Sequence, residues 1–338
     1  MRTVFSNNDS KIMSQLLKGA SQFRGLTKPN PMVGAALVKN GELIATGFHE
    51  AYGVDHAERQ LLNSYSGSVD GLELFVTLEP CTHHGNTPPC KELILESGIK
   101  RLVIATLDPN PKIEASLEEY KAQGISVELG CCENEAIKLN DVYFKRFLFQ
   151  EPFVSMKVAT TLDGRIATSS GDSCYITSPE SRKICHQLRR DSDMIVVGVD
   201  TVIQDDPELT VRYNLLDGGY SQPKVLILDS SLRTPMTSRL FSLFDKECLF
   251  IATAASDEQW APFDSLATRI VLTGKSYEET WASLLSQVYQ QGIFHVFIEG
   301  GSTVFSSALA AGIVDRYHAF MSPSVMNDSE AMPVLKGP

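Results

Sequence analysis

A histidine, a glutamate and two cysteines stand at spacings that suit a catalytic metal. The chain carries His56-Ala57-Glu58 ahead of Pro80-Cys81 and Cys90. Catalytic zinc needs a few nitrogen or sulfur ligands and one open position, where a water loses its proton near neutral pH. His56, Cys81 and Cys90 meet that requirement, and Glu58 can carry the proton from the water to a leaving amine. This order of residues is typical of zinc-dependent deaminases of nucleobases.

The spacing of the two cysteines leaves a structural zinc site open as an alternative. Eight residues separate Cys81 from Cys90, whereas the general deaminase signature has two. A structural site closes with four protein ligands, and the candidates for a fourth are His83, His84 and His49. The remaining cysteines lack such partners, and we expect them to pack as small apolar side chains; they are Cys131, Cys132, Cys174, Cys185 and Cys248.

The elements that position these residues alternate between helix and strand. Hydrophobic periodicity predicts a helix at 12–24, a hairpin of strands 32–38 and 42–46, and a helix from about His56. A strand at 72–78, a helix from Cys90, a strand at 101–106 and a helix near 115–123 follow. This alternation favours a layered α/β domain, which we expect to end near Gln150.

The second half predicts another α/β domain, over 151–338. Strand-like runs recur at 153–159, 194–199, 224–228, 248–253 and 295–299, and polar runs at 169–173 and 217–221 indicate surface loops. Gly300-Gly301 ends the last of these strands ahead of a predicted helix near 302–310. Backbone amides there can meet a cofactor phosphate.

Composition narrows the range of partners. With 30 basic and 41 acidic residues the net charge is −11, which disfavours nucleic acid. Seven cysteines at irregular spacing, without an export signal, argue against a disulfide framework. No apolar run is long enough to span a membrane. We therefore expect a cytoplasmic enzyme that acts on small molecules.

Motifs in both halves resemble one family. The first half has KPNP at 28–31, VG at 33–34, LEPCTHHGNTPPC at 78–90 and DPNP at 108–111. The second half has KVATTLDGRIA at 157–167, GVDTV at 198–202, DDPELTVR at 205–212 and EGG at 299–301. Over nearly the whole chain this resembles the bifunctional riboflavin-biosynthesis deaminase/reductase family, in which the long gap between the cysteines is usual.

The resemblance implies two domains and two reactions. It implies a cytidine-deaminase-like three-layer α/β/α domain over 1–150 and a dihydrofolate-reductase-like α/β domain over 151–338. The first would bind Zn2+ and replace a ring amine of 2,5-diamino-6-(5-phosphoribosylamino)pyrimidin-4-one with oxygen. The second would use NADPH to reduce the ribosyl chain to ribityl. The family further implies a homodimer or higher homo-oligomer.

The resemblance also assigns residues to the two sites. The deaminase substrate would contact Asn30, His49, His83, Asp108 and Asn110. NADPH would contact Ala159, Tyr175, Thr201, Asp205, Ser230 and Gly301. The reductase substrate would contact Ser173, Arg189, Leu209, Arg212 and Glu299, with the two arginines holding its phosphate. The alternatives are turn formation for Asn30 and 108–111, and solvated surface side chains for the two arginines.

Three departures from the family pattern qualify these expectations. The DPNP run lacks the two glycines that usually follow and is one residue short, which predicts a reshaped deaminase pocket near the sugar phosphate. Tyr175 replaces the usual tryptophan. The chain stops at Lys336-Gly337-Pro338, earlier than the fold suggests, and 321–338 matches poorly, so the reductase half is expected to be impaired or to need a partner subunit.

Four other functions compete with the bifunctional enzyme. They are a deaminase with an inactive second half, a paralogue of altered pyrimidine specificity, a nucleic-acid deaminase, and a zinc-stabilised binding module. The net charge and the motifs of the second half argue against the third, and Glu58 beside an open metal position argues against the fourth.

Overall fold

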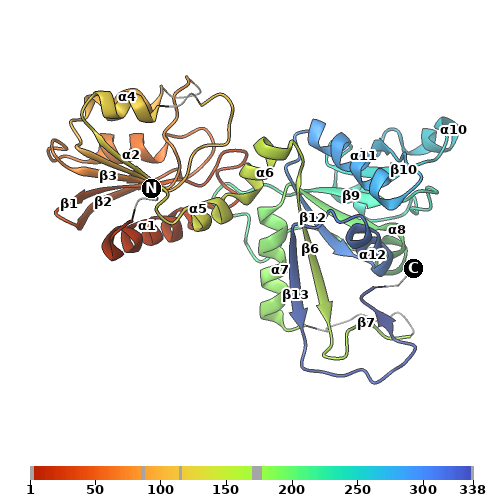
Figure 1. The fold of residues 1–338 in the computed structure, drawn as a ribbon. Helices are drawn as coiled ribbons and strands as arrows, with labels where there is room; N and C mark the ends of the chain where they lie inside the picture. The colour runs from red at the N-terminus through yellow and green to blue at the C-terminus, as the bar shows by residue number, and fades with distance from the viewer. Residues whose placement is uncertain (1–3, 85–87, 114–115, 170–176, 336–338) are drawn as a thin grey trace. The chain divides into compact units, whose positions relative to one another are not determined.

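The computed structural model describes residues 4–84, 88–113, 116–169 and 177–335. The chain divides into two compact units, Met1–Gln150 and Glu151–Pro338, each built around its own β-sheet (Figure 1). Within the described residues, no helix has both the length and the apolar character needed to cross a membrane.

The first unit contains a five-stranded sheet in the order β2-β1-β3-β4-β5. The strands are β1 (Gly34–Lys39), β2 (Glu42–Phe48), β3 (Glu73–Val76), β4 (Arg101–Ile104) and β5 (Ser126–Leu129). β1 is antiparallel to β2 and β3, whereas β3, β4 and β5 are parallel. The hairpin turns at Asn40 and Gly41, whose φ angles of 52° and 81° suit a two-residue turn that matches the strand twist.

Helices cover both faces of this sheet. They are α1 (Asn7–Ala20), α2 (Ala57–Ser64), α3 (Cys90–Glu96), α4 (Leu117–Ala122), α5 (Glu133–Leu139) and α6 (Asp141–Phe149). Alternate residues of β1 point to opposite faces. Ala36 and Val38 pack with α1 and α5, and Ala35 and Leu37 pack with α2, α3 and α4. The predicted three-layer α/β/α arrangement is confirmed.

The second unit contains a seven-stranded parallel sheet in the order β11-β10-β9-β8-β12-β6-β13. Its strands are β6 (Phe153–Thr160), β8 (Met194–Gly198), β9 (Lys224–Leu228), β10 (Leu249–Thr253), β11 (Thr268–Val271), β12 (His295–Gly300) and β13 (Arg316–Met321). A separate pair joins β7 (Arg165–Ala167) to β14 (Met332–Pro333). Because the large sheet is parallel, the carboxyl ends of its strands share one edge.

Two apolar cores flank the second sheet. Its helices are α7 (Pro179–Asp191), α8 (Val199–Asp205), α9 (Leu240–Leu243), α10 (Asp257–Trp260), α11 (Tyr277–Gln290) and α12 (Ser302–Ala310). α11 and α12 bury Trp281 and Phe305 against one face, while α8, α9 and α10 bury Val202, Leu240 and Trp260 against the other. The expected α/β class is confirmed for this half as well.

Helix α1 begins earlier than the predicted start at residue 12. The Ser6 hydroxyl accepts a hydrogen bond from the Asp9 N–H at 3.1 Å, and the Asp9 carboxylate accepts one from the Ser6 N–H at 3.2 Å. This reciprocal cap satisfies amides that would otherwise lack partners. The cap therefore sets the start of the helix ahead of its first buried apolar residue, Ile12.

Gly47 is the point at which β2 approaches α2, the helix that follows His56. A Cβ added there would lie 2.6 Å from the Ala57 carbonyl oxygen and 2.7 Å from the Leu61 Cβ. We predict that Gly47→Ala destabilises the first unit by about 1–3 kcal/mol through overpacking. Denaturant unfolding measures this, with the exposed neighbour Thr46→Ala as the control, expected to change stability by about 0.5 kcal/mol or less. Equal stability of the two variants would contradict the prediction.

Candidate metal centre and active sites

The three predicted metal ligands come from three separate elements. His56 is the N-cap of α2, Cys81 follows β3, and Cys90 is the first residue of α3. The Cys90 N–H donates to the Cys81 sulfur at 3.3 Å, and the Lys91 N–H donates to the Cys81 carbonyl at 3.1 Å. These backbone contacts fix the start of α3 against the segment that follows β3.

The spacing of the ligand atoms fits zinc. The Nδ1 atom of His56 lies 3.4 Å from the Cys81 Sγ and 3.6 Å from the Cys90 Sγ. Tetrahedral zinc with ordinary Zn–S and Zn–N lengths places such atoms roughly 3.5–3.6 Å apart. In the described part of the chain, the group that can hold a metal contains these three residues and none of His49, His83 or His84. That arrangement favours a catalytic centre with an open position over a closed structural site.

Glu58 lies beside this cluster in the first turn of α2, and its side chain is 3% exposed. Burial, with the Cys81 sulfur nearby, raises the pKa of its carboxyl to about 7. A group that titrates near neutral pH can both accept and donate a proton during one reaction. Glu58 therefore has the position and the acidity of a proton shuttle.

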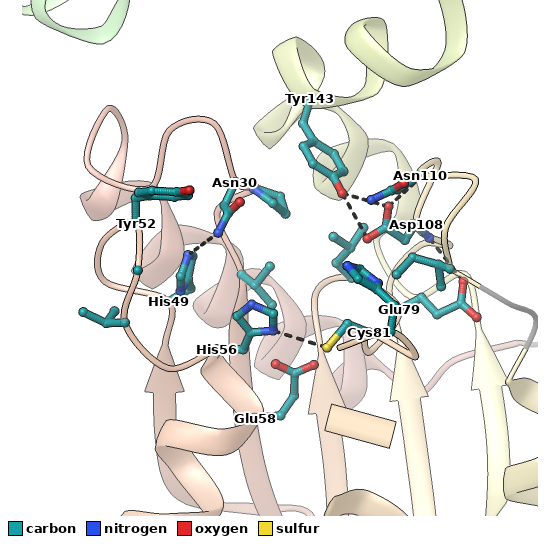
Figure 2. A pocket seen from close by; sticks show the side chains of 17 residues that line it. Asn30, His49, Tyr52, His56, Glu58, Glu79, Cys81, Asp108, Asn110 and Tyr143 are labelled. Carbon is teal, nitrogen blue, oxygen red and sulfur yellow. Dashed lines mark hydrogen bonds between the residues drawn. The ribbon is translucent and has the colours of Figure 1, made fainter. Parts of the chain in front are cut away.

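A cavity of about 260 Å³ opens over the cluster. Figure 2 shows His56, Cys81 and Glu58 at its base, Asn30, His49 and Tyr52 on one wall, and the acidic Glu79 and Asp108 with Asn110 and Tyr143 on the other. His83 also lines it, so the structure brings all five predicted deaminase contacts together. The Nδ1 atom of His83 is buried and has no hydrogen-bond partner among the described residues.

The sheet explains why these walls meet. β3 and β4 are parallel neighbours, so the segments after their carboxyl ends run side by side. The Glu79 N–H donates to the Thr106 carbonyl at 2.9 Å, and the Asp108 N–H donates to the Glu79 carboxylate at 3.3 Å. On the other side, the His49 N–H donates to the Val33 carbonyl at 3.0 Å.

A hydrogen-bond chain fixes the state of His49. Its Nδ1 lies 3.1 Å from the Asp55 carbonyl oxygen, which only accepts, so Nδ1 carries the proton. Burial lowers the pKa of His49, so the ring is neutral at pH 7 and its Nε2 accepts from the Asn30 side-chain amide at 3.3 Å. The side-chain oxygen of Asn30 then remains to accept a hydrogen bond from a ligand.

A second cavity, of about 880 Å³, lies at the carboxyl edge of the parallel sheet in the second unit. Its lining includes most of the predicted reductase contacts: Ala159, Thr201, Asp205, Gly301, Arg189, Leu209, Arg212 and Glu299. Gly301 is the N-cap of α12, and no side-chain hydrogen bond caps that helix. Its first amides therefore suit an anionic group such as a dinucleotide phosphate.

Three predicted contacts are not among the lining residues. Ser230 follows β9 and is exposed, and its carbonyl oxygen accepts from the Ala254 N–H at 3.1 Å and from the Thr253 hydroxyl at 3.2 Å. Ser173 and Tyr175 lie outside the described residues.

Two family models match the chain. The cytidine and deoxycytidylate deaminase zinc-binding region matches residues 6–106, and the RibD C-terminal domain matches residues 152–337. The second match runs through 321–337, where the motifs read from the sequence show little resemblance.

Relatives match over nearly the whole chain. The riboflavin biosynthesis protein RibD of Aquifex aeolicus is 38% identical over 95% of this chain and 88% of its own.

The chain belongs to the RibD family. It is a bifunctional deaminase and reductase of riboflavin biosynthesis, and its cofactors are Zn2+ and NADPH.

Solved structures agree with this family assignment. The diaminohydroxyphosphoribosylaminopyrimidine deaminase/5-amino-6-(5-phosphoribosylamino)uracil reductase of Thermotoga maritima is 35% identical, with a TM-score of 0.83 over 97% of this chain and 89% of that one. RibD of Acinetobacter baumannii is 34% identical, with a TM-score of 0.83 over 98% and 91% of the two chains.

Arg189 of this RibD-family chain has a different environment from the one its sequence suggests. Its guanidinium makes a bidentate pair with Glu299, at 2.5 and 2.8 Å, and donates to the Thr210 carbonyl at 2.9 Å. The two side chains are 13% and 9% exposed, so Arg189 is not a solvated surface residue. Because two nitrogens of the Arg189 guanidinium donate to Glu299, this side chain cannot offer all of its donors to a phosphate. Arg212 is 56% exposed and pairs with Glu208.

Several lining residues escaped sequence reasoning. Glu79, Tyr52 and Tyr143 line the deaminase cavity, and Lys157 and His186 line the reductase cavity. His186 accepts the Arg212 N–H at 3.1 Å, and burial lowers its pKa to about 4. Glu79 lies in the family motif at 78–90 and Lys157 in the motif at 157–167. Membership of those motifs could have identified both residues. Tyr143 and His186 lie on helices without a motif.

We predict that Arg189→Met destabilises the second unit by about 3–5 kcal/mol at pH 7, because it leaves the buried Glu299 carboxylate unpaired. Burial opposes the charged form, but the Arg189 guanidinium holds the pKa of Glu299 below its ordinary value. Without that guanidinium the pKa rises above its value in the unfolded chain, so the deficit shrinks as the pH falls from 7 towards 5. Urea unfolding at both pH values tests this. Arg212→Met, an exposed pair, is the control and should cost about 1 kcal/mol or less.

Proposed function

We propose that the first unit hydrolytically deaminates 2,5-diamino-6-(5-phosphoribosylamino)pyrimidin-4-one and that the second unit reduces the ribosyl chain of the product with NADPH. The observation that carries the first step is a buried Glu58, with a pKa of about 7, beside three metal ligands at the base of a cavity. The reactions named for the Thermotoga maritima relative support this substrate pair.

In the deaminase site, His56, Cys81 and Cys90 would hold zinc, and Glu58 would move protons. Zinc in such a site activates a water as a nucleophile at neutral pH. Glu58 accepts a proton from the attacking water and delivers it to the departing amine, which leaves as ammonia.

Cavity side chains position the pyrimidine over the metal centre. Asn30 offers an oxygen acceptor, held by the neutral His49, and His83 offers its buried Nδ1. Asp108 and Asn110 face the ring or its sugar from the opposite wall.

In the reductase site, the cofactor would bind in the cavity at the carboxyl edge of the parallel sheet. Gly301 and the uncapped start of α12 would bind a phosphate of NADPH, near Thr201 on α8, and Ala159 and Asp205 would complete the contacts. The family resemblance adds Ser230, which follows β9 and is not among the residues that line this cavity, and Tyr175, which lies outside the described residues. NADPH supplies the hydride that reduces the ribosyl carbon.

The substrate of the reductase lies beside the buried pair of Arg189 and Glu299. Leu209 and Arg212 line the same part of the cavity. The guanidinium of Arg212 is more exposed than that of Arg189, so it is better placed to bind the phosphate of the substrate. Ser173, which the resemblance also assigns to this substrate, lies outside the described residues.

A homodimer or higher homo-oligomer and a cytoplasmic location complete the proposal. β13 is an edge strand of the large sheet, and Tyr317 and Met321 on it are 46% and 63% exposed, which suits pairing with a second copy. The described cysteines are free thiols, as expected in a reducing compartment.

Product analysis by mass spectrometry tests both reactions. Zinc-loaded protein is incubated with the diaminopyrimidinone ribosyl phosphate, with and without NADPH. We predict exchange of an amine for oxygen in both samples, and a further gain of two hydrogens only with NADPH. Deamination alone in both samples would contradict the reductase half, and no change in either would contradict the substrate.

Glu58→Gln separates the two activities. We predict that it lowers kcat for ammonia release by at least about 100-fold, because the amide cannot relay the proton. NADPH oxidation with the pre-deaminated substrate should stay within about twofold, since that site lies in the other unit. Chelation of zinc should have the same selective effect and be reversed by added zinc. A loss of both activities, or of neither, would contradict this assignment.

A further inference from the structure

Tyr143 is a cavity residue that no motif assigns. It lies on α6 and lines the same cavity as His56 and Glu58. Its hydroxyl donates to the Asp108 carboxylate, 3.1 Å from Oδ1 and 3.3 Å from Oδ2. Its ring makes an edge contact with Phe147 at 4.8 Å between centroids. Figure 2 shows the tyrosine reaching across the wall to Asp108.

The hydrogen bonds of Asp108 leave part of its carboxylate for a ligand. Oδ1 accepts from the Asn110 N–H at 2.8 Å as well as from Tyr143. A carboxylate offers about four lone-pair sites over two oxygens, and a single hydroxyl proton cannot bond both oxygens well. Oδ2 therefore keeps capacity to accept, and Asp108 lines the cavity.

The Tyr143 hydroxyl also favours the charged form of Asp108. Burial raises the pKa of Asp108 to about 6, and the nearby Glu79 and Cys81 raise it as well, whereas the Asn110 amide and the Tyr143 hydroxyl lower it. The last two groups donate to the carboxylate, so they stabilise the ion. Without Tyr143, more of Asp108 is protonated near neutral pH.

We propose that Tyr143 is a positioning residue of the deaminase site, and that it holds Asp108 as a charged acceptor for an N–H or O–H donor of the pyrimidine substrate. This rests on the deaminase function proposed above. Because a carboxylate only accepts and repels anions, the group at this wall is an amino group or a sugar hydroxyl. The phosphate of the substrate lies away from Asp108 and Glu79.

Tyr143→Phe tests this with the ring retained. We expect KM for deamination to rise about tenfold, as for loss of one charge-assisted hydrogen bond, while kcat stays within about threefold because the metal ligands and Glu58 are untouched. The transition temperature of the first unit should fall only slightly. An unchanged KM overturns the proposal, and so does a kcat loss as large as the KM effect.

The pH profile separates positioning from a general structural role. Binding should weaken as the pH falls and Asp108 is protonated, and the midpoint should move to higher pH in Tyr143→Phe. The titratable groups around Asp108 are Glu79, Cys81 and Tyr143 itself. Glu79 and Cys81 are present in both the wild type and Tyr143→Phe. A difference between the two pH profiles therefore measures the effect of the Tyr143 hydroxyl. Coincident profiles overturn the proposal.

A double-mutant cycle and a matched control complete the test. In an Asp108→Asn background, Tyr143→Phe should raise KM by less than about twofold, because the carboxylate charge that Tyr143 stabilises is already removed. Tyr65→Phe, in the same unit but outside the cavity and packed against the core, should leave KM unchanged. Additive effects in the cycle, or an equal effect of Tyr65→Phe, overturn the proposal. A wild-type chain without deaminase activity instead contradicts the proposed function.

Discussion

A buried carboxyl beside two cysteine sulfurs is favourable only when positive charge is near. Glu58 is 3% exposed, Cys90 is fully buried, and the Cys81 sulfur contributes to the raised pKa of Glu58. Two thiolates and a carboxylate taken out of water would repel each other strongly. A divalent cation held by Cys81, Cys90 and His56 would offset most of that repulsion. Glu58 lies beside the same cluster and would accept a proton there, so one electrostatic constraint links metal binding and catalysis.

In both units the site is assembled at the carboxyl ends of parallel strands. In the first, the segments after β3 and β4 bring Cys81, Glu79 and Asp108 together. In the second, the ends of β8 and β12 place Gly198 and Gly300 at one edge, followed by α8 and α12. Backbone groups at that edge are not used by the ladder, so they and the following side chains are available to ligands. Sites built on strand ends are also held rigidly by the sheet behind them.

This geometry explains which features the sequence could predict. The residues of these sites that belong to short sequence motifs could be predicted, and so could the layered fold around them. They are His56, Glu58, Cys81, Cys90, Asp108 and the pair Gly300 and Gly301. Contacts between distant elements carry no local signal. Arg189 and Glu299 stand 110 positions apart, and Tyr143 stands 35 from Asp108. Short or irregular elements such as β5, α5 and α6 lack a strong period, and the Ser6 cap begins α1 before its apolar stripe.

The segment after Asp108 keeps two polar residues at the cavity without the glycines that usually follow in the family. The absence of glycines there suggested a reshaped pocket, because glycine usually signals a backbone that other residues avoid. Residues 108–113 contain no positive φ angle. The turn is held instead by side chains, as Asp108 accepts the Asn110 N–H at 2.8 Å and Asn110 accepts the Lys112 N–H at 3.1 Å. Both residues still line the cavity. Asn and Asp form such turns readily, so these two polar residues stay at the wall of the cavity without glycine. The Asn110 N–H uses one oxygen of Asp108, so the other oxygen is open to the ligand donor that we propose for this wall.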